Sequence, residues 1–225
     1  AITACDAIIN NGGFSLVSDL YDNAGSQAIF GDEMPNQEVI LSVFVDANDA
    51  PRNIIGIRTL HGPHGNALFG FSTWNGATVH QDFINRYSDD DKRKAQWLLG
   101  SQPGGVNYTL NISSLTSAGI EEGARSAKFL PVPPYSGESA SNDFPVFRYA
   151  DVLLTKAEAI LRNGGDEAAA RALVDEVRNR AGLDNYNGAM TLNEVYNERG
   201  RELCWEGHRR QDMIRYGTFT AARSF

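Results

Sequence analysis

The chain has 225 residues, and its 42% hydrophobic and 21% charged residues fit an ordinary globular protein with a sizeable core. Its 20 Lys and Arg residues are outnumbered by 28 Asp and Glu residues, which gives a formal net charge of −8. Sequence-independent nucleic-acid binding depends on clustered cations. The charge balance therefore argues against a nucleic-acid partner and against electrostatic docking on anionic lipid, and it suits a neutral ligand.

The two cysteines, Cys5 and Cys204, stand nearly a full chain length apart and in no metal-binding or redox spacing. We expect both to be buried, because a thiol behaves as a small apolar side chain. No stretch approaches the ~18 consecutive apolar residues of a membrane span, and no leader is visible. Since the sequence begins at Ala1 within a helical pattern, we expect further residues of a longer protein to precede it.

The first two-thirds of the chain predict short elements separated by loops. Apolar residues at helical spacing predict a helix over residues 1–11, which ends at a pair of glycines. Residues 38–45, EVILSVFV, are rich in β-branched side chains and predict a strand. Residues 46–78 contain many Gly, Asn, His and Pro and predict a long loop region. A short helix is expected over 81–87, and short strands and loops over 94–147.

From Arg148 onward the pattern becomes helical. Apolar residues at helical spacing predict helices over 148–162 and 166–181, with Asp166 as the N-cap of the second. Two such helices joined by a few residues form an antiparallel hairpin of the size of one tetratricopeptide unit. A single hairpin cannot bury its apolar face alone, so it should stack on other helices.

Two further helices are expected near the C-terminus. Thr191 and Glu194 form a T-x-x-E capping box that opens one of them, and the last runs through residues 209–216. The predicted fold is mainly α, with tetratricopeptide-like helical hairpins and a loop-rich region that contains short β-strands. We expect one domain over 1–225, loop-rich and mixed over 1–147 and helical over 148–217.

Carboxylates and guanidinium groups interleave in the segment that follows Thr191. Glu198, Arg201, Glu202 and Glu206 fall at helical spacing, so they share one side of a helix. Paired carboxylates can act as acid and base on a glycosidic bond. Every carboxylate here has an Arg within one turn, which favours the ionised form, whereas a general acid needs a raised pKa. We therefore expect a structural network of ion pairs that holds one helix to another.

Other candidate chemistry is sparse. His61 and His64 form an H-G-P-H pair without a third ligand nearby in sequence, and Asp89-Asp90-Asp91 lacks the spacing of a calcium loop. We found no nucleophile elbow, phosphate-binding loop or zinc-protease motif. The sequence predicts a protein that is not an enzyme and that uses no metal or cofactor.

Aromatic residues in the irregular segments are the main binding candidates. Sugar rings present apolar C–H faces on which a flat exposed aromatic ring can stack, while Asn, Arg and His bind the hydroxyls. Trp74 is the leading candidate platform, with Phe71, His64 and Asn75 near it in sequence and Tyr108 in a later segment. Phe69 and Tyr135 have similar surroundings. The alternative for each ring is that it pins its loop to the core, which is what we expect of Trp97 and Trp205.

Residues 144–217 resemble the SusD/RagB family, the outer-membrane nutrient-binding lipoproteins of Bacteroidetes. The resemblance is carried by three stretches in order: FPVFRYADVLLTKAEAILR (144–162), VDEVRNRAGL (174–183) and ERGRELCWEGHRRQDMIRYGTF (198–219). Gly200 departs from the pattern, because it occupies a helical position where the family usually has a better helix former.

The resemblance implies a surface-exposed glycan- or nutrient-binding protein of the outer membrane that delivers oligosaccharides to a TonB-dependent (SusC-like) transporter. It also implies attachment by a lipid anchor outside this chain, which would be the C-terminal part of a longer protein. The matching motifs build the fold, so they assign no binding residues. Two other hypotheses stay open at this point: a helical-repeat scaffold for protein partners without glycan binding, and a hydrolase that uses Glu198 or Glu202.

Overall fold

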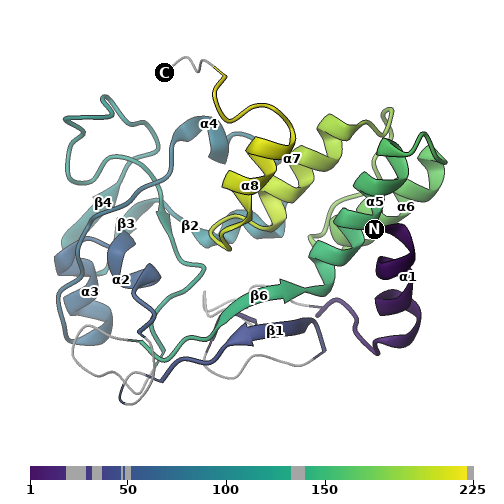
Figure 1. Ribbon diagram of the computed structural model, residues 1–225. Coiled ribbons are helices and arrows are strands. Elements are labelled where there is room, and N and C mark those ends of the chain that lie inside the picture. The colour runs from purple at the N-terminus through teal and green to yellow at the C-terminus, as the bar shows by residue number, and fades with distance from the viewer. Residues whose placement is uncertain (19–28, 32–36, 47, 49–51, 133–139, 222–225) are drawn as a thin grey trace. The chain divides into compact units, whose positions relative to one another are not determined.

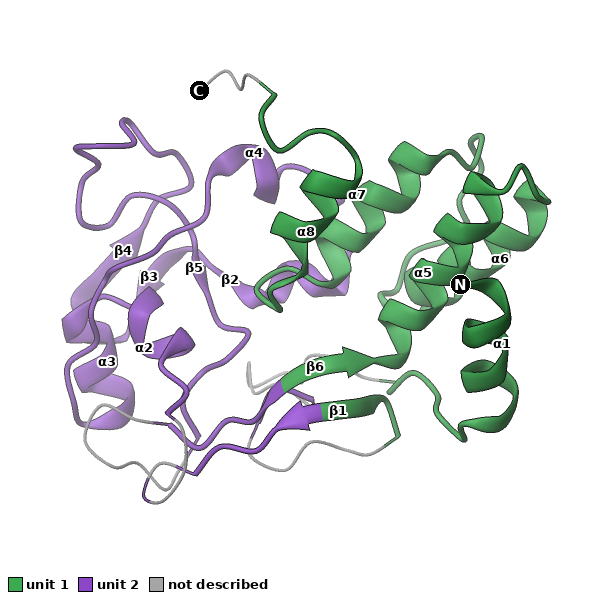
Figure 2. Ribbon diagram, in the orientation of Figure 1, with its two compact units in different colours: residues 1–18, 36–41, 145–225 green, residues 19–35, 42–144 purple. Residues whose placement is uncertain are grey.

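The computed structural model describes residues 1–18, 29–31, 37–46, 48, 52–132 and 140–221 (Figure 1). The chain divides into two compact units (Figure 2). Unit 1 contains residues 1–18, 36–41 and 145–225, and unit 2 contains residues 19–35 and 42–144. That the whole chain forms a single domain stays a prediction. None of the helices in the described ranges is long and apolar enough to cross a membrane.

Unit 1 is helical. Its helices are α1 (Ile2–Asn11), α5 (Tyr149–Arg162), α6 (Glu167–Arg180), α7 (Leu192–Glu202) and α8 (His208–Arg215). Helix α5 packs against α1, α6 and α7, and α7 also packs against α6 and α8. The consecutive helices α5 and α6 form the predicted hairpin. These bounds confirm the helices expected over 1–11, 148–162 and 166–181 and the two helices expected near the C-terminus.

The N-caps predicted for two of these helices are present. The Asp166 carboxylate accepts a hydrogen bond of 2.8 Å from the backbone N–H of Ala168, at the start of α6. The Thr191 hydroxyl accepts one of 3.3 Å from the backbone N–H of Glu194, at the start of α7. Each bond satisfies a backbone donor that has no partner inside its helix.

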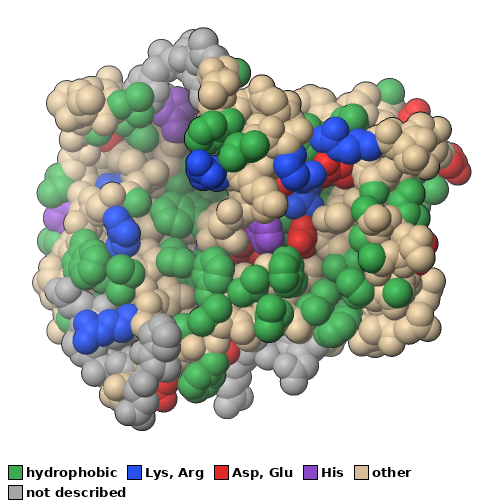
Figure 3. All heavy atoms as spheres, in the orientation of Figure 1, with side chains coloured by type: hydrophobic (Ala, Val, Ile, Leu, Met, Phe, Trp, Pro, Cys, Tyr) green, Lys and Arg blue, Asp and Glu red, His purple; other side chains and the backbone are tan. Residues whose placement is uncertain are grey.

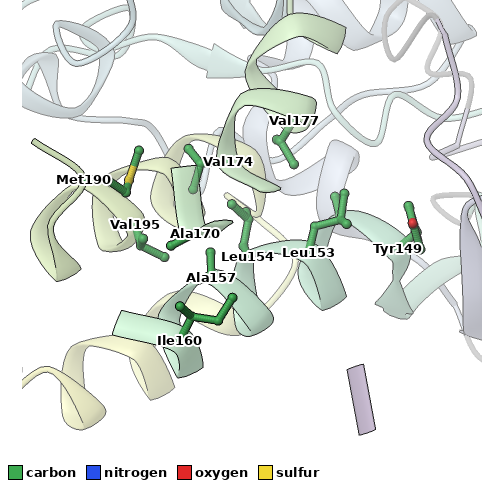
Figure 4. Close-up of a cluster of buried hydrophobic side chains, with 11 residues drawn as sticks. Tyr149, Leu153, Leu154, Ala157, Ile160, Ala170, Val174, Val177, Met190 and Val195 are labelled. Atoms are coloured by element: carbon green, nitrogen blue, oxygen red, sulfur yellow. The ribbon is translucent and has the colours of Figure 1, made fainter. Parts of the chain in front are cut away.

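The apolar core of unit 1 lies between α5, α6 and α7 (Figure 4). Leu153, Leu154 and Ala157 of α5 are fully buried in it, because they recur at helical spacing on the face that meets the other helices. The remaining buried members are Tyr149, Ala150, Ile160, Ala170, Val174, Val177, Met190 and Val195. Both cysteines are buried, as predicted.

Packing explains why a glycine occupies position 200 in α7. A Cβ atom built at this position would lie 2.9 Å from Nη1 of Arg209. The Arg209 guanidinium lies over the ring of Tyr196, 3.6 Å from the ring centroid, and donates a hydrogen bond of 2.9 Å to the Tyr196 carbonyl. The glycine in α7 therefore leaves room for an arginine from α8, which offsets its weak helix propensity.

Unit 2 consists of short elements. Its helices are α2 (Ile55–Thr59), α3 (Gly62–Phe69) and α4 (Gln81–Ile84), with the 3-10 turns η1 (Lys92–Gln96) and η2 (Pro103–Gly105). Its strands form two antiparallel pairs, β2 (Trp97–Leu98) with β5 (Arg125–Ser126) and β3 (Gly100–Gln102) with β4 (Val106–Tyr108). A third pair, β1 (Val39–Val43) with β6 (Phe144–Arg148), contains two of the points where the chain passes between the units. Strand β1 confirms the strand predicted over 38–45, and α4 confirms the short helix predicted over 81–87, although it is shorter.

The prediction of a long loop over 46–78 is wrong, because α2 and α3 lie in that range. Pro63 occupies the first turn of α3, where its missing N–H has no intrahelical partner to lose. Gly70 ends the helix with φ 77°, a left-handed conformation that glycine adopts without strain. Gly65 lets α3 approach Thr73, whose side chain lies 2.4 Å from where a Cβ would be. The glycines and proline that suggested a loop are thus the cap, the first turn and a packing contact of a helix.

Trp97 and Trp205 differ in environment. Trp97 is 6% exposed and packs edge-to-face against Phe83 and Tyr87, as expected of a core residue. Trp205 is half-buried, so the core position predicted for it is confirmed only in part. Its φ of 64° is left-handed, which is unusual for so bulky a residue.

Candidate functional site around Trp74

Trp74 is exposed and stands on a fixed backbone. Its side chain is 47% exposed, which confirms the exposure expected from the sequence. Its backbone N–H donates to the carbonyl of Ile57 at 3.0 Å, and the next residue, Asn75, donates to the carbonyl of Leu60 at 2.9 Å. Gly76 continues the series with a bond of 2.7 Å to the Arg58 carbonyl. The segment is therefore hydrogen-bonded to α2 and to the residue that follows α2. These bonds fix the backbone that carries the indole ring.

Phe69 and Phe71 lie close to Trp74 in sequence and against each other in space. Their ring centroids are 5.7 Å apart and their planes are inclined by 28°, so the rings are stacked. Both side chains are half-buried. Leu68, which precedes them at the end of α3, is 42% exposed. The end of α3 and the segment after it thus present an apolar surface, as expected for Phe71. Tyr135 lies outside the described residues.

His64 and Tyr108 are buried, each 2% exposed, so the expectation that they reach the surface is wrong. Strand β4 explains Tyr108, because its residues alternate in burial and Val106 and Tyr108 point inward while Asn107 points outward. Nδ1 of His64 lies 3.1 Å from the Tyr108 hydroxyl, which also accepts a bond of 2.9 Å from the backbone N–H of His61. Burial and, second, the neighbouring His61 lower the pKa of His64, and burial raises that of Tyr108. The pair supports α3 from beneath.

Asn75 holds two segments together. Its φ is 51°, a left-handed conformation that Asn tolerates better than most residues. The side-chain oxygen accepts hydrogen bonds from Nη2 and Nε of Arg125 at 2.8 and 3.2 Å. The side-chain nitrogen donates to the Ile120 carbonyl at 3.0 Å. Because the amide already has these protein partners, its main role is to hold the backbone that carries Trp74.

Arg125 is the residue of this region that sequence reasoning missed. Its side chain is 2% exposed and lies over the ring of Tyr108, 4.7 Å from the centroid. Burial lowers the pKa of Arg125, against the electrostatic effects of Tyr108 and Glu121. The guanidinium donates to oxygen atoms of Asn75, Thr78, Ile120, Glu122 and Gly123. A lone arginine in GARSAK has no motif around it, so only the fold reveals these contacts.

The loop between β4 and β5 has its own internal support. The Glu122 carboxylate accepts hydrogen bonds of 2.7 Å from both the backbone N–H and the hydroxyl of Ser113, which lower the pKa of Glu122. At the outer part of this loop the side chain of Ile120 is 60% exposed and that of Leu115 is 73% exposed. The loop thus presents apolar side chains from a hydrogen-bonded base.

Other exposed apolar side chains lie on β1, just after β1, and on β6. Leu41, Val43 and Phe44 are 52%, 44% and 66% exposed, and Phe147 is 50% exposed. Figure 3 shows apolar side chains gathered over these two strands. Phe44 is thus an exposed phenylalanine of unit 2 that can serve as a control for Trp74.

The carboxylates considered for hydrolysis are buried in ion pairs. Glu202 is 0% exposed and binds Arg148, with an Oε1–Nη1 distance of 2.6 Å, and Arg180. Glu198 is 1% exposed and binds Arg201 at 2.5 Å. Neither carboxylate is accessible to a glycosidic bond and a water molecule, as hydrolysis requires. Among the described residues, no group of three His, Cys, Asp or Glu side chains could hold a metal ion.

Comparisons with known proteins identify relatives of this chain. Residues 117–224 match the model of the SusD family. Starch-binding protein SusD of Bacteroides thetaiotaomicron is 44% identical over 78 residues, which are 35% of this chain and 14% of that protein. The chain therefore spans only a small part of this curated relative.

Solved structures share the fold over nearly the whole chain. Surface glycan-binding protein A from Bacteroides thetaiotaomicron, in complex with laminarihexaose, aligns with a TM-score of 0.71 and 21% identity over 96% of this chain and 50% of that one. A SusD-like protein from Bacteroides fragilis aligns with a TM-score of 0.74 and 19% identity, also over 96% and 50%. The chain spans about half the length of these structures, whose fold it shares. Residues 117–224 thus match the SusD family, and the chain shares the fold of these SusD-like structures over nearly its whole length.

Proposed function

We propose that this chain is part of a surface glycan-binding protein that captures oligosaccharides and delivers them to a TonB-dependent outer-membrane transporter. The observation that carries the proposal is the exposed indole of Trp74 on a hydrogen-bonded backbone. An aromatic ring held in place loses little conformational entropy when it stacks on a sugar face. The net charge of −8 also suits a neutral ligand.

The proposed site has two kinds of residue. Trp74 is the stacking platform, and Phe71, half-buried and stacked on Phe69, extends the apolar surface near it. Asn75 belongs to the site through the backbone it fixes. His64 and Tyr108 are assigned a supporting role, because their buried side chains lie beneath α3.

The protein is proposed to bind glycans without cleaving them. Its relatives are named as binding proteins, for starch in one case and for glycans in another. The buried, ion-paired Glu198 and Glu202 favour a structural role for the carboxylates. Incubation of the chain with starch or laminarin should release no reducing sugar above the level of a protein-free control. Release that disappears on Glu202→Gln would contradict this assignment.

The location and the partner are proposed on the family alone. A SusD family member at the outer-membrane surface would be held by a lipid anchor outside the chain described here and would contact its transporter there. Pull-down of a TonB-dependent transporter from outer membranes with the full-length protein would support the partnership. Recovery of the full-length protein in a fraction without outer-membrane markers would oppose the proposed location.

Affinity electrophoresis tests the binding proposal. Native gels that contain starch or laminarin are suitable, because one relative is named for starch and another was solved in complex with laminarihexaose. The parent chain should be retarded by at least one, and Trp74→Ala should migrate as in a glycan-free gel. Phe44→Ala removes another exposed aromatic ring of unit 2 and should leave the retardation unchanged. Equal retardation of the parent and Trp74→Ala would exclude Trp74 from the site.

A further inference from the structure

The surroundings of Arg125 call for an explanation beyond stability. Taking a cation out of water is strongly unfavourable unless hydrogen bonds and nearby charges compensate. The guanidinium is 2% exposed, and its hydrogen bonds go to an amide, a hydroxyl and three backbone carbonyls. In contrast, the buried Arg93 of the same unit forms a two-pronged ion pair with Asp91, with bonds of 2.9 and 2.8 Å. Arg125 is thus arranged to hold backbone rather than to neutralise a carboxylate.

The backbone held by Arg125 belongs to two segments that are distant in sequence. On one side are the Asn75 side chain and the Thr78 hydroxyl, at 2.8 and 2.7 Å. On the other side are the carbonyls of Ile120, Glu122 and Gly123, at 2.8, 2.8 and 2.5 Å. One planar group with donors in a fixed geometry therefore sets the distance between the two segments.

Other contacts keep the two segments close. The Thr78 hydroxyl donates to the Ala124 carbonyl at 2.9 Å, and the Val79 N–H donates to the same carbonyl at 3.0 Å. Gly123 has φ 80°, and a Cβ atom there would lie 2.1 Å from the Thr78 hydroxyl oxygen. Only glycine permits this approach. The junction is built for close contact on both sides of Arg125.

Each segment carries an exposed apolar side chain next to the residues that Arg125 holds. Trp74 precedes Asn75 and is 47% exposed. Ile120, whose carbonyl accepts from both Asn75 and Arg125, is 60% exposed. Two exposed apolar side chains on one hydrogen-bonded junction can together form a contact surface for a ligand.

We propose that Ile120 is a second ligand-contact residue beside Trp74, and that Arg125 is a positioning residue that fixes the distance between them through Asn75. This inference rests on the proposed glycan-binding function and adds to it. The ligand would stack on the indole and pack an apolar edge of a sugar ring against Ile120. The loop between β4 and β5 would then determine which glycans fit.

Binding measurements test the contact residue. The test uses whichever gel, starch or laminarin, retards the parent. In that gel Ile120→Ala should raise the Kd by about 5- to 10-fold, as expected for the loss of one buried apolar contact. Leu115→Ala removes a more exposed apolar side chain of the same loop and should change nothing. If Trp74→Ala abolishes retardation and Ile120→Ala does not reduce it, the second contact is wrong while the proposed function stands. If neither variant has an effect, both are wrong.

Hydrogen exchange tests the positioning role without a ligand. Arg125→Lys keeps the charge but cannot supply the planar array of donors. Amides of peptides covering residues 72–79 and 109–123 should exchange faster in this variant. The matched control, Arg93→Lys, removes an equally buried arginine of unit 2 and should leave exchange in both peptides as in the parent. Unchanged exchange in Arg125→Lys would overturn the positioning role. Binding of Arg125→Lys to the glycan as tight as that of the parent would also overturn it.

Discussion

Arg148 and Glu206 form a two-pronged ion pair inside unit 1, with Nε–Oε2 and Nη2–Oε1 distances of 2.7 and 2.9 Å. Both side chains are 1% exposed. The same guanidinium binds Glu38 at 2.7 Å and Glu202 at 2.6 Å. Burial opposes the charge on Arg148, but the carboxylates of Glu206, Glu202 and Glu38 outweigh it and raise its pKa. Arg148 thus joins the start of α5, the end of α7 and the segment before β1.

Removal of Arg148 should destabilise the protein strongly. Arg148→Met removes the cation that three buried carboxylates share, although Glu38 and Glu202 still contact Arg180. Breaking a buried pair typically costs about 3–5 kcal/mol. Urea denaturation followed by circular dichroism measures the change. Arg162→Met is the control, because the Arg162 side chain, which pairs with Glu158, is 42% exposed. A half-exposed pair should contribute at most about 1 kcal/mol. Equal losses in the two variants would contradict a central role for Arg148.

Alanine at Gly123 should be far more harmful than alanine at Gly70. Both glycines have left-handed φ angles, 80° and 77°, so each substitution incurs a backbone strain of about 1–2 kcal/mol. Only at Gly123 would the new Cβ collide with another atom, the Thr78 hydroxyl oxygen at 2.1 Å; at Gly70 nothing lies within 4 Å. Thermal unfolding should show a larger decrease in Tm for Gly123→Ala. Similar decreases would mean that the segments do not approach each other so closely.

Acidification should destabilise unit 2 through His64. Burial, followed by the effect of His61, lowers the pKa of His64 in the folded protein below its ordinary 6.5. As the pH falls below about 6.5, the unfolded chain takes up a proton that the folded chain does not, so the free energy of unfolding decreases. A neutral His64 ring can accept a hydrogen bond from the Tyr108 hydroxyl, whereas a protonated ring cannot.

The measurement compares urea denaturation at pH 7.5 and pH 5.5. His64→Gln should show a smaller loss of stability on acidification than the parent, although it is less stable at pH 7.5. A loss in His64→Gln equal to that of the parent would contradict a titrating role for His64.

The helices of unit 1 could be predicted because their signals are local. Apolar spacing marks α5 and α6, and the caps at Asp166 and Thr191 mark two helix starts. Unit 2 was less predictable, because α2 and α3 depend on contacts with distant residues. Gly56, for example, lets α2 approach the backbone of Phe129, where a Cβ would lie 2.0 Å from the carbonyl oxygen. From composition alone, such glycines predict a loop.

The candidate site was predictable in part for the same reason. Trp74 was identified from its polar, glycine-rich neighbours and is exposed. Tyr108 has similar neighbours, but the alternation of β4 turns its side chain inward, and this strand is only three residues long. Arg125 left no signal, since its partners Asn75 and Ile120 stand 50 and 5 residues away and two of its five acceptor residues lie in the segment before α4. Three of its acceptors are backbone carbonyls, which every residue type has, so the sequence does not mark them.

The most direct test of the central claim uses the indole N–H signals of the three tryptophans, Trp74, Trp97 and Trp205. The chain labelled with 15N-tryptophan is titrated with laminarin or starch, whichever retards it in gels, and each signal is assigned by substitution. Trp74 is exposed whereas Trp97 is buried in an aromatic cluster, so the account predicts a saturable shift of the Trp74 signal and an unchanged Trp97 signal. A bound chain in which the Trp74 signal does not move would contradict it.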